Sequence, residues 1–129
     1  MFQYKIKYSE LNAKQKENYN FHKVSAALAD YGYNSMRLSD DWQGADFIAI
    51  SGDDMIKVQL KGRFTIDKKY IDKNIYIAFI ENENIKIYKH DEALKVIPEN
   101  VKTSKSWKEV GNYSWGKTPK YFNELIITL

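Results

Sequence analysis

A predicted β-hairpin in the middle of the chain constrains the fold more than any other feature. Residues 45–51 and 55–61 both alternate apolar with more polar side chains, and the sequence Ser-Gly-Asp-Asp between them is typical of a tight turn. One face of this hairpin carries only apolar side chains, which are Ala45, Phe47, Ala49, Ile56, Val58 and Leu60. We expect the protein core to cover that face, because burying apolar surface is the main driving force of folding.

The turn fixes which side chains of the two strands face each other. A loop of two residues places Ser51 opposite Asp54, and a loop of four residues continues the same register. In that register Asp46 faces Gln59, with Cβ atoms about 4.5–5.5 Å apart. Lys61 follows two residues after Gln59 and therefore points to the same side of the sheet. An acid, an amide and an amine are thus expected together at one end of the hairpin.

Helices and further strands are predicted on both sides of this hairpin. The preceding residues predict a short strand at 2–8, a helix at 13–31 that ends at Gly32, a strand at 33–38 and a polar loop at 39–44. The following residues predict an irregular segment at 62–73 and a second hairpin formed by residues 74–80 and 85–90. Three short helices are predicted after it: one capped by Asp91, one at 103–110, and one capped by Thr118. With 129 residues, the chain is expected to form one domain, residues 1–129, of the α/β type in its α+β form.

The predicted long helix adds an acidic side chain to this picture. Its apolar stripe consists of Phe21, Val24, Leu28 and Tyr31. One helical turn before Phe21, the same stripe reaches Glu17. A carboxylate in line with a packing face is expected at the edge of the core. The alternative is a solvent-exposed glutamate, which is favoured near a helix N-terminus by the helix dipole.

Composition excludes several kinds of site. The chain has no cysteine, which excludes disulfides, zinc sites with cysteine ligands and thiol chemistry. Its two histidines, His22 and His90, are too far apart in sequence for a histidine-rich metal site. The longest apolar runs have about five residues and the N-terminus lacks an apolar signal core, so we expect no membrane association and a cytoplasmic location.

Basic residues are unevenly distributed, although the net charge is only +3. They gather at 57–73 and 101–120, whereas residues 81–100 are mildly acidic. Basic patches on a nearly neutral chain suit a polyanion such as nucleic acid, although lysine-rich surface is often simply solvated. The side chains that we expect to contact nucleic acid are Lys57, Arg63, Lys68, Lys69 and, in the loop before the hairpin, Trp42.

The order of these residues resembles the PD-(D/E)XK nuclease superfamily. A helix with Glu17 is followed by Gln-Gly-Ala-Asp ending at Asp46, and then by Val-Gln-Leu-Lys ending at Lys61. The lead-in from helix through glycine to strand is similar to archaeal Holliday-junction resolvases. The glutamine variant of the motif is similar to some restriction and homing endonucleases. The resemblance implies a restriction endonuclease-like core, with a central mixed β-sheet flanked by helices.

The resemblance also implies an activity, which is metal-dependent hydrolysis of phosphodiester bonds with DNA as the expected substrate. The cofactor would be Mg²⁺, with Mn²⁺ as an alternative, because such sites offer oxygen ligands. The implied metal ligands are Asp46, Gln59, the carbonyl of Leu60, and Glu17. Lys61 would orient the attacking water or stabilise charge in the transition state. Nucleases of this kind often act as dimers, so a homodimer is considered as well.

Two features leave other functions open. Gln59 stands where the superfamily usually has an acid, and it keeps an oxygen ligand while losing a charge, so metal binding is expected to weaken. The superfamily core usually has a helix after the lysine strand, whereas residues 62–73 are too short and irregular to predict one. The alternatives are a non-catalytic nucleic-acid-binding module and an accessory subunit of a defence or mobile-element system.

Overall fold

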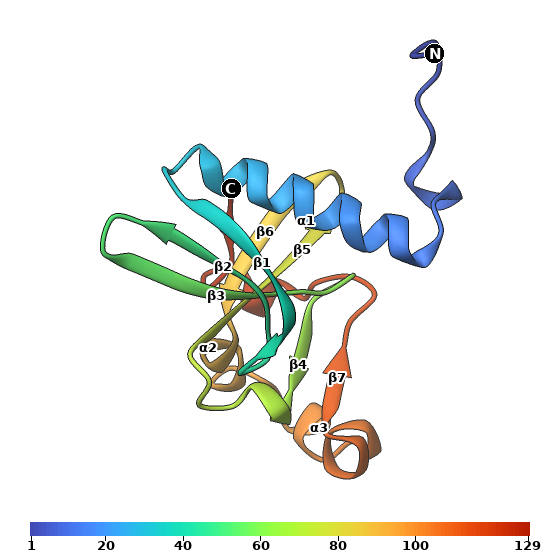
Figure 1. Ribbon diagram of the computed structural model, residues 1–129. Coiled ribbons are helices and arrows are strands. Elements are labelled where there is room, and N and C mark those ends of the chain that lie inside the picture. Colours follow the sequence, from blue (N-terminus) through green and yellow to red (C-terminus); the bar gives the residue numbers. More distant parts are fainter.

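A mixed six-stranded β-sheet is the framework of the computed structural model, which describes all residues 1–129 (Figure 1). Its strands follow the order β1-β2-β3-β5-β6-β8. Their bounds are Asn34–Trp42 (β1), Ala45–Ser51 (β2), Asp54–Leu60 (β3), Ile75–Glu81 (β5), Asn84–Lys89 (β6) and Ile127–Thr128 (β8). β3 and β5 run parallel, and every other neighbouring pair is antiparallel. Two short strands, β4 (Thr65–Asp67) and β7 (Asn112–Ser114), pair separately.

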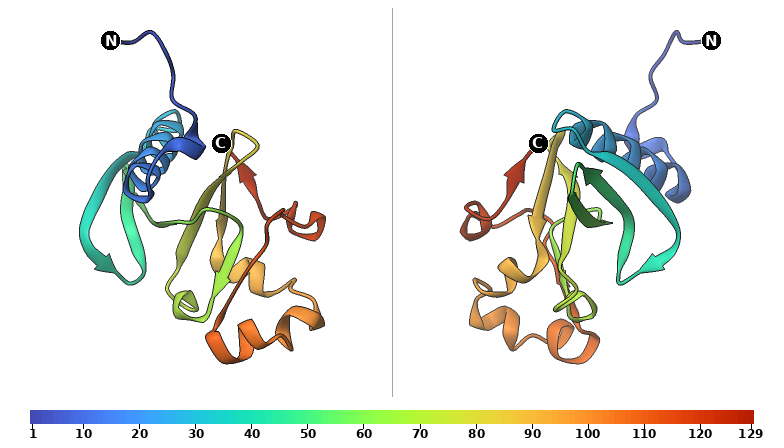
Figure 2. Two further views of the ribbon diagram at one scale, coloured as in Figure 1. Left: turned by 90° about the vertical axis from the view of Figure 1, so that its right-hand side faces the viewer. Right: turned by 60° about the vertical axis from the view of Figure 1, so that its left-hand side comes forward.

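Helices flank this sheet. The α-helices are α1 (Ala13–Ala29), α2 (His90–Leu94) and α3 (Glu99–Lys102), and the shorter turns are η1 (Tyr8–Glu10), η2 (Lys68–Tyr70), η3 (Ser106–Val110) and η4 (Lys120–Phe122). Figures 1 and 2 show α1 lying across one end of the sheet, with the short C-terminal helices gathered at the opposite end of the molecule. This arrangement confirms the predicted α+β class with a central mixed sheet. No helix combines the length and the apolar character needed to cross a bilayer.

Two hydrophobic clusters hold the sheet in place. The cluster beneath α1 consists of Val24, Leu28, Phe47, Ala49, Val58, Ala78 and Ile87, all of them buried. The larger cluster lies where the C-terminal segments meet β5 and β6, and it is rich in aromatic rings. There Phe64 stacks against both Tyr88 and Phe122, with ring centroids 4.1 Å apart in each pair. The strands β5 and β6 contribute side chains to both clusters and are therefore packed on both faces.

The structure confirms the central hairpin and its register. β2 and β3 pair antiparallel, with Phe47 opposite Val58 and Ser51 opposite Asp54. The connecting turn consists of two residues, the first of which is Gly52 with φ +60°. The buried Phe47 and Val58 face α1 as part of its cluster. The polar side chains of the hairpin therefore lie on the side of the sheet that faces away from α1.

Three predictions for the N-terminal part are wrong in detail. Residues 2–8 form no strand, because no other strand pairs with them and Phe2 remains 95% exposed. The long helix ends at Ala29, so Tyr31 is exposed rather than part of the apolar stripe. The predicted polar loop at 39–44 is largely strand, because β1 continues to Trp42 and pairs there with β2.

The C-terminal predictions also require correction. The N-cap of α2 is Lys89 and not Asp91, which lies in the first turn of that helix. Of the helix predicted at 103–110, residues 103–104 form a turn after α3 and only the part from Ser106 to Val110 is helical, as the π-helical turn η3. Thr118 caps no helix, because its N–H and its hydroxyl both donate to the carboxylate of Glu81.

The connection from β3 to β5 contains no α-helix, as the irregular sequence of residues 62–73 predicts. It is built from β4 and the single turn η2. The parallel crossover is instead anchored by the buried side chains of Phe64, Ile66 and Tyr70, which belong to the aromatic cluster. This compact connection presents two exposed lysines, Lys68 and Lys69, in the turn η2.

Gly44 offers a test of how tightly this connection packs against the β1–β2 turn. Gly44 has φ +88°, and a Cβ added there would lie 2.8 Å from Cδ1 of the buried Tyr70. Gly52 has φ +60° and nothing within 4 Å of the same position. Both alanine variants lose stability because alanine disfavours a left-handed backbone conformation. Gly44→Ala also introduces a steric clash, which should lower the free energy of unfolding by about 1–3 kcal/mol more than Gly52→Ala does. Chemical denaturation should show this excess, and equal losses for both variants would contradict the packing described.

Candidate active site

Asp46 lies at the start of β2, directly after the tight β1–β2 turn, and contacts the end of β3. Its Oδ2 accepts a hydrogen bond from the backbone N–H of Leu60 at 2.9 Å. Burial raises the pKa of Asp46, as do the charges of Asp41 and Glu17, whereas the Leu60 N–H and Lys61 act in the opposite direction. This half-buried carboxylate is therefore fixed by the neighbouring strand and lies within the fields of acids and a lysine.

Gln59 is the next position beyond the Phe47–Val58 pair and belongs to the same end of the hairpin. Its Nε2 donates to the carbonyl oxygen of Leu60 at 3.2 Å. Its Oε1 is buried and has no hydrogen-bond partner. Buried polar atoms are nearly always hydrogen-bonded, so this oxygen is available to accept from a water or to bind a ligand.

Lys61 follows β3 directly, and its backbone is held by a hydrogen bond from its N–H to the carbonyl of Ala78 at 3.0 Å. Its Nζ lies 5.4 Å from the centroid of the Tyr70 ring. Burial lowers the pKa of Lys61, and Lys69 adds to that effect, whereas the carboxylates of Asp67 and Asp46 raise it. Lys61 is thus a half-buried amine placed between acidic and basic neighbours.

Tyr70 and Asp67, to which no role was assigned from the sequence, shape the surroundings of Lys61. Tyr70 is only 2% exposed, and burial raises the pKa of its hydroxyl. Asp67 caps the turn η2 by accepting from the N–H of Lys69 at 3.0 Å. The N–H of Asp67 in turn donates to Nε2 of the buried His90 at 3.0 Å. The only sequence signal was an aspartate before a short turn, which is common in structural caps.

Glu17 lies near Asp46, but its carboxylate is engaged elsewhere. Its side chain is 55% exposed and forms ion pairs with Arg37 at 3.5 Å and Lys14 at 3.7 Å. Glu17, Asp41 and Asp46 line one cleft of about 180 Å³. The predicted acid of the helix thus shares a cleft with Asp46, and Asp41 joins it from the end of β1. The sequence did not single out Asp41 because it lies in the segment predicted as a polar loop.

Among the residues predicted to contact nucleic acid, Lys57 is already engaged within the protein. Its Nζ donates to Oε1 of Gln43 at 2.6 Å and to the carbonyl of Lys73, and it lies 5.5 Å from the Trp42 ring. Trp42 itself is 44% exposed. Lys57 thus links the β1–β2 turn to the loop before β5.

The other predicted contact residues belong to the connection after β3. Arg63, Lys68 and Lys69 are all exposed. Nζ of Lys68 lies 5.2 Å from the Trp107 ring, and Nζ of Lys69 lies 3.9 Å from Oδ2 of Asp67. Arg63 thus follows β3 closely, whereas Lys68 and Lys69 lie in η2 after β4, and all three cations are accessible to a polyanion.

The oxygen atoms at this end of the hairpin suit a hard cation that keeps several waters better than a metal ion that requires several carboxylate ligands. No three His, Cys, Asp or Glu side chains gather in a way that could hold a metal ion. The oxygen donors at the site are instead the carboxylate of Asp46, the unpaired Oε1 of Gln59 and the carbonyl of Leu60. A sparse set of oxygen donors is compatible with Mg²⁺, which keeps several of its waters.

Comparisons with known proteins place the fold and not the family. No family model matches the chain. No curated protein sequence matches it either. In structure, the chain is similar to a bacterial homing endonuclease, I-Ssp6803I, with a TM-score of 0.54 and 12% sequence identity over 87% of this chain and 85% of that one. At this identity the likeness shows a shared nuclease-like fold alone.

The unpaired oxygen of Gln59 makes a prediction about stability. Gln59→Met keeps a similar volume and removes the buried Oε1, so it should raise the free energy of unfolding of the metal-free protein by about 1 kcal/mol. Gln59→Glu, the matched variant, places a second acid beside Asp46 and should lower that free energy at neutral pH. Urea denaturation measures both changes. A loss of more than about 1 kcal/mol in Gln59→Met would assign Gln59 a structural role instead.

Proposed function

We propose that this protein is a metal-dependent endonuclease that hydrolyses phosphodiester bonds in DNA. The proposal rests on Asp46, Gln59 and Lys61, which the register of the β2–β3 hairpin brings to the end where β2 begins and β3 ends. Asp46 is fixed by the Leu60 N–H, Gln59 carries an unpaired buried oxygen, and Lys61 is held half-buried beside them. The nuclease-like fold supports the proposal from an independent direction.

Each residue then has a defined role. Asp46, Gln59 and the carbonyl of Leu60 would hold Mg²⁺ or Mn²⁺, and Glu17 would contribute through a water. Such a cation polarises a phosphate oxygen and lowers the pKa of bound water. Lys61 donates hydrogen bonds to the attacking water or to a non-bridging phosphate oxygen, where negative charge increases in the transition state. Its lowered pKa makes its proton easier to transfer than that of a surface lysine.

The surroundings favour a nucleic acid as the substrate. Arg63, Lys68 and Lys69 extend the positive charge from Lys61 along the connection to β5. Contacts of this kind position a phosphate backbone without reading its sequence. The structural neighbour is described as a homing endonuclease, from which we carry over DNA as the proposed substrate. A homodimer would allow both strands of a duplex to be cut.

The small number of acidic metal ligands favours a second function, which is binding of nucleic acid without cleavage. Asp46 is the single acid among the proposed direct ligands, and Glu17 is paired with Arg37. A site that binds metal weakly would leave a module that binds nucleic acid without cutting it. In that case binding falls steeply with salt, because each phosphate contact releases counterions. The variant Gln59→Glu would then be expected to recover metal affinity.

Cleavage of supercoiled plasmid with Mg²⁺, with Mn²⁺ or with EDTA tests the proposal. We expect nicking only with metal, and Lys61→Ala should reduce its rate by about a hundredfold or more. Asp46→Ala should reduce the rate at least as much, because it removes the acid of the site.

A matched control excludes a contaminating nuclease. Lys95 is exposed and pairs with Glu92 on α2, so Lys95→Ala should cut at the wild-type rate when it is purified in parallel. Equal cutting by the Lys61 and Lys95 variants would contradict the proposed site. Metal-independent binding of plasmid without any cutting would favour the non-catalytic module.

A further inference from the structure

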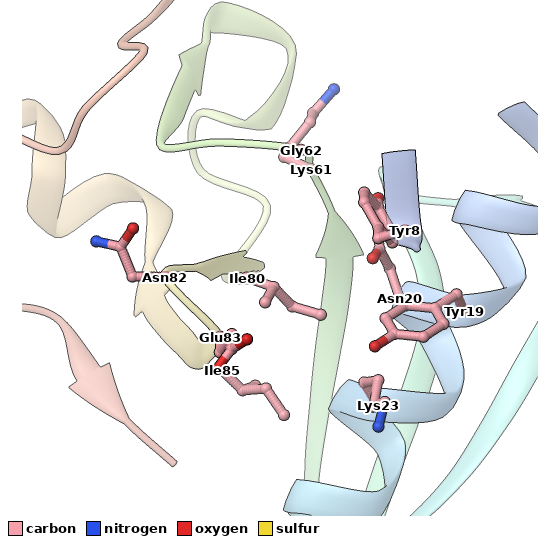
Figure 3. A pocket seen from close by; sticks show the side chains of 10 residues that line it. All are labelled: Tyr8, Tyr19, Asn20, Lys23, Lys61, Gly62, Ile80, Asn82, Glu83 and Ile85. Carbon is pink, nitrogen blue, oxygen red and sulfur yellow. The ribbon is translucent and has the colours of Figure 1, made fainter. Parts of the chain in front are cut away.

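A cleft larger than the one shared by Glu17 and Asp46 lies outside the candidate active site but touches its edge. It has a volume of about 660 Å³, which is within the range of roughly 300–1,000 Å³ typical of small-ligand sites. One wall is formed by η1 and the middle of α1, and the other by the β5–β6 turn (Figure 3). The backbone at the end of β3 closes the cleft between these walls. Neither the predicted motif nor the proposed catalytic residues account for this cleft.

The wall from η1 and α1 presents two aromatic rings. Tyr8 and Tyr19 have ring centroids 5.2 Å apart and are 41% and 39% exposed, so part of each ring is free. Nζ of Lys16 lies 5.5 Å from the Tyr8 ring, and Nζ of Lys23 lies 5.3 Å from the Tyr19 ring. Each ring therefore has a cation beside it. Aromatic faces next to lysines are the combination with which proteins bind unpaired bases and their phosphates.

The remaining side chains suit the edges and the second face of a flat ring. Ile80 and Ile85 lie across the cleft from the tyrosines and offer an apolar surface. Asn20 and Glu83 supply amide and carboxylate groups. Asn offers both a donor and acceptor to a base edge, and a carboxylate accepts from an exocyclic amine.

Lys61 connects this cleft to the candidate active site. Lys61 and Gly62 both line the cleft, and Figure 3 shows the Lys61 side chain pointing away from the other lining side chains. The backbone at the end of β3 therefore borders the cleft, while the amine belongs to the site with Asp46 and Tyr70. A nucleic-acid strand with a phosphate at Lys61 would have its neighbouring nucleotide at the mouth of the cleft.

We infer that this cleft binds an unpaired nucleobase of a nucleic-acid strand, stacked on Tyr8 and Tyr19. The inference rests on the proposed function, which supplies nucleic acid as the class of ligand. It adds a preference for single-stranded or locally opened substrates. A base inside a duplex is already stacked and cannot enter the cleft without leaving its partner.

Binding of three fluorescein-labelled probes in EDTA tests this inference without any cleavage. The probes are oligo(dT), an abasic oligomer with the same number of phosphates, and the duplex of oligo(dT) with oligo(dA). The wild type should bind oligo(dT) about tenfold more tightly than the abasic oligomer, because only the former can stack. Tyr19→Ala and Tyr8→Ala should abolish this difference, and Tyr19→Phe should retain it. Tyr31→Ala is the matched control, because Tyr31 is exposed at the far end of α1 and lines no part of the cleft.

The outcomes separate this inference from the nuclease proposal. Equal affinity of the wild type for oligo(dT) and the abasic oligomer would overturn the base pocket, even if the plasmid is cut. The same holds if Tyr19→Ala keeps the full preference, or if the duplex binds as tightly as oligo(dT). A preference that depends on Tyr19, without any metal-dependent cutting, would support the pocket and remove the nuclease proposal.

Discussion

The hydrogen bond from the Leu60 N–H to Asp46 is the contact on which the candidate active site depends. It continues the β2–β3 pairing past Phe47 and Val58, with a side chain in place of a backbone carbonyl. A shift of one residue in this register would turn Asp46 towards α1 and the apolar face towards water. The buried cluster under α1 therefore determines the position of the acid as much as the acid's own hydrogen bond does.

Packing on the opposite side of the sheet controls the electrostatics of the same site. The connection after β3 is pinned by buried aromatic side chains, and it holds Tyr70 against Lys61. Burial then lowers the pKa of Lys61 and raises that of Asp46, so both shifts favour the neutral forms. The opposite charge of each group acts against the pKa shift of the other, and so favours the charged forms of Asp46 and Lys61. Half-buried ionisable groups with shifted pKa values cluster at functional sites.

The sequence predicted this part of the molecule well because the hairpin is governed by local rules. Alternation, a two-residue turn and an apolar face are enough to predict the register from Ser51–Asp54 to Phe47–Val58, after which Asp46 and Gln59 are the next residues of their strands. Long-range packing was not predictable in the same way. Tyr70 reaches Lys61 only because the aromatic cluster folds the connection back. The strand expected at 2–8 failed because an alternating pattern does not supply the partner strand that pairing requires. The sequence predicted Glu17 near the site. Its ion pair with Arg37 was not predictable, because it depends on the position of β1 relative to α1.

Calorimetric titration of Mn²⁺ tests most directly whether this end of the hairpin is a metal site. The wild type should bind one Mn²⁺ ion with measurable heat, and Asp46→Ala should show no binding at that site, because the carboxylate is its single charged direct ligand. Asp53→Ala, in the exposed hairpin turn, should bind as the wild type does. Binding that survives in Asp46→Ala, or a wild-type protein that binds no Mn²⁺, would contradict the assignment of Asp46 and Gln59 as the metal-binding core of the site.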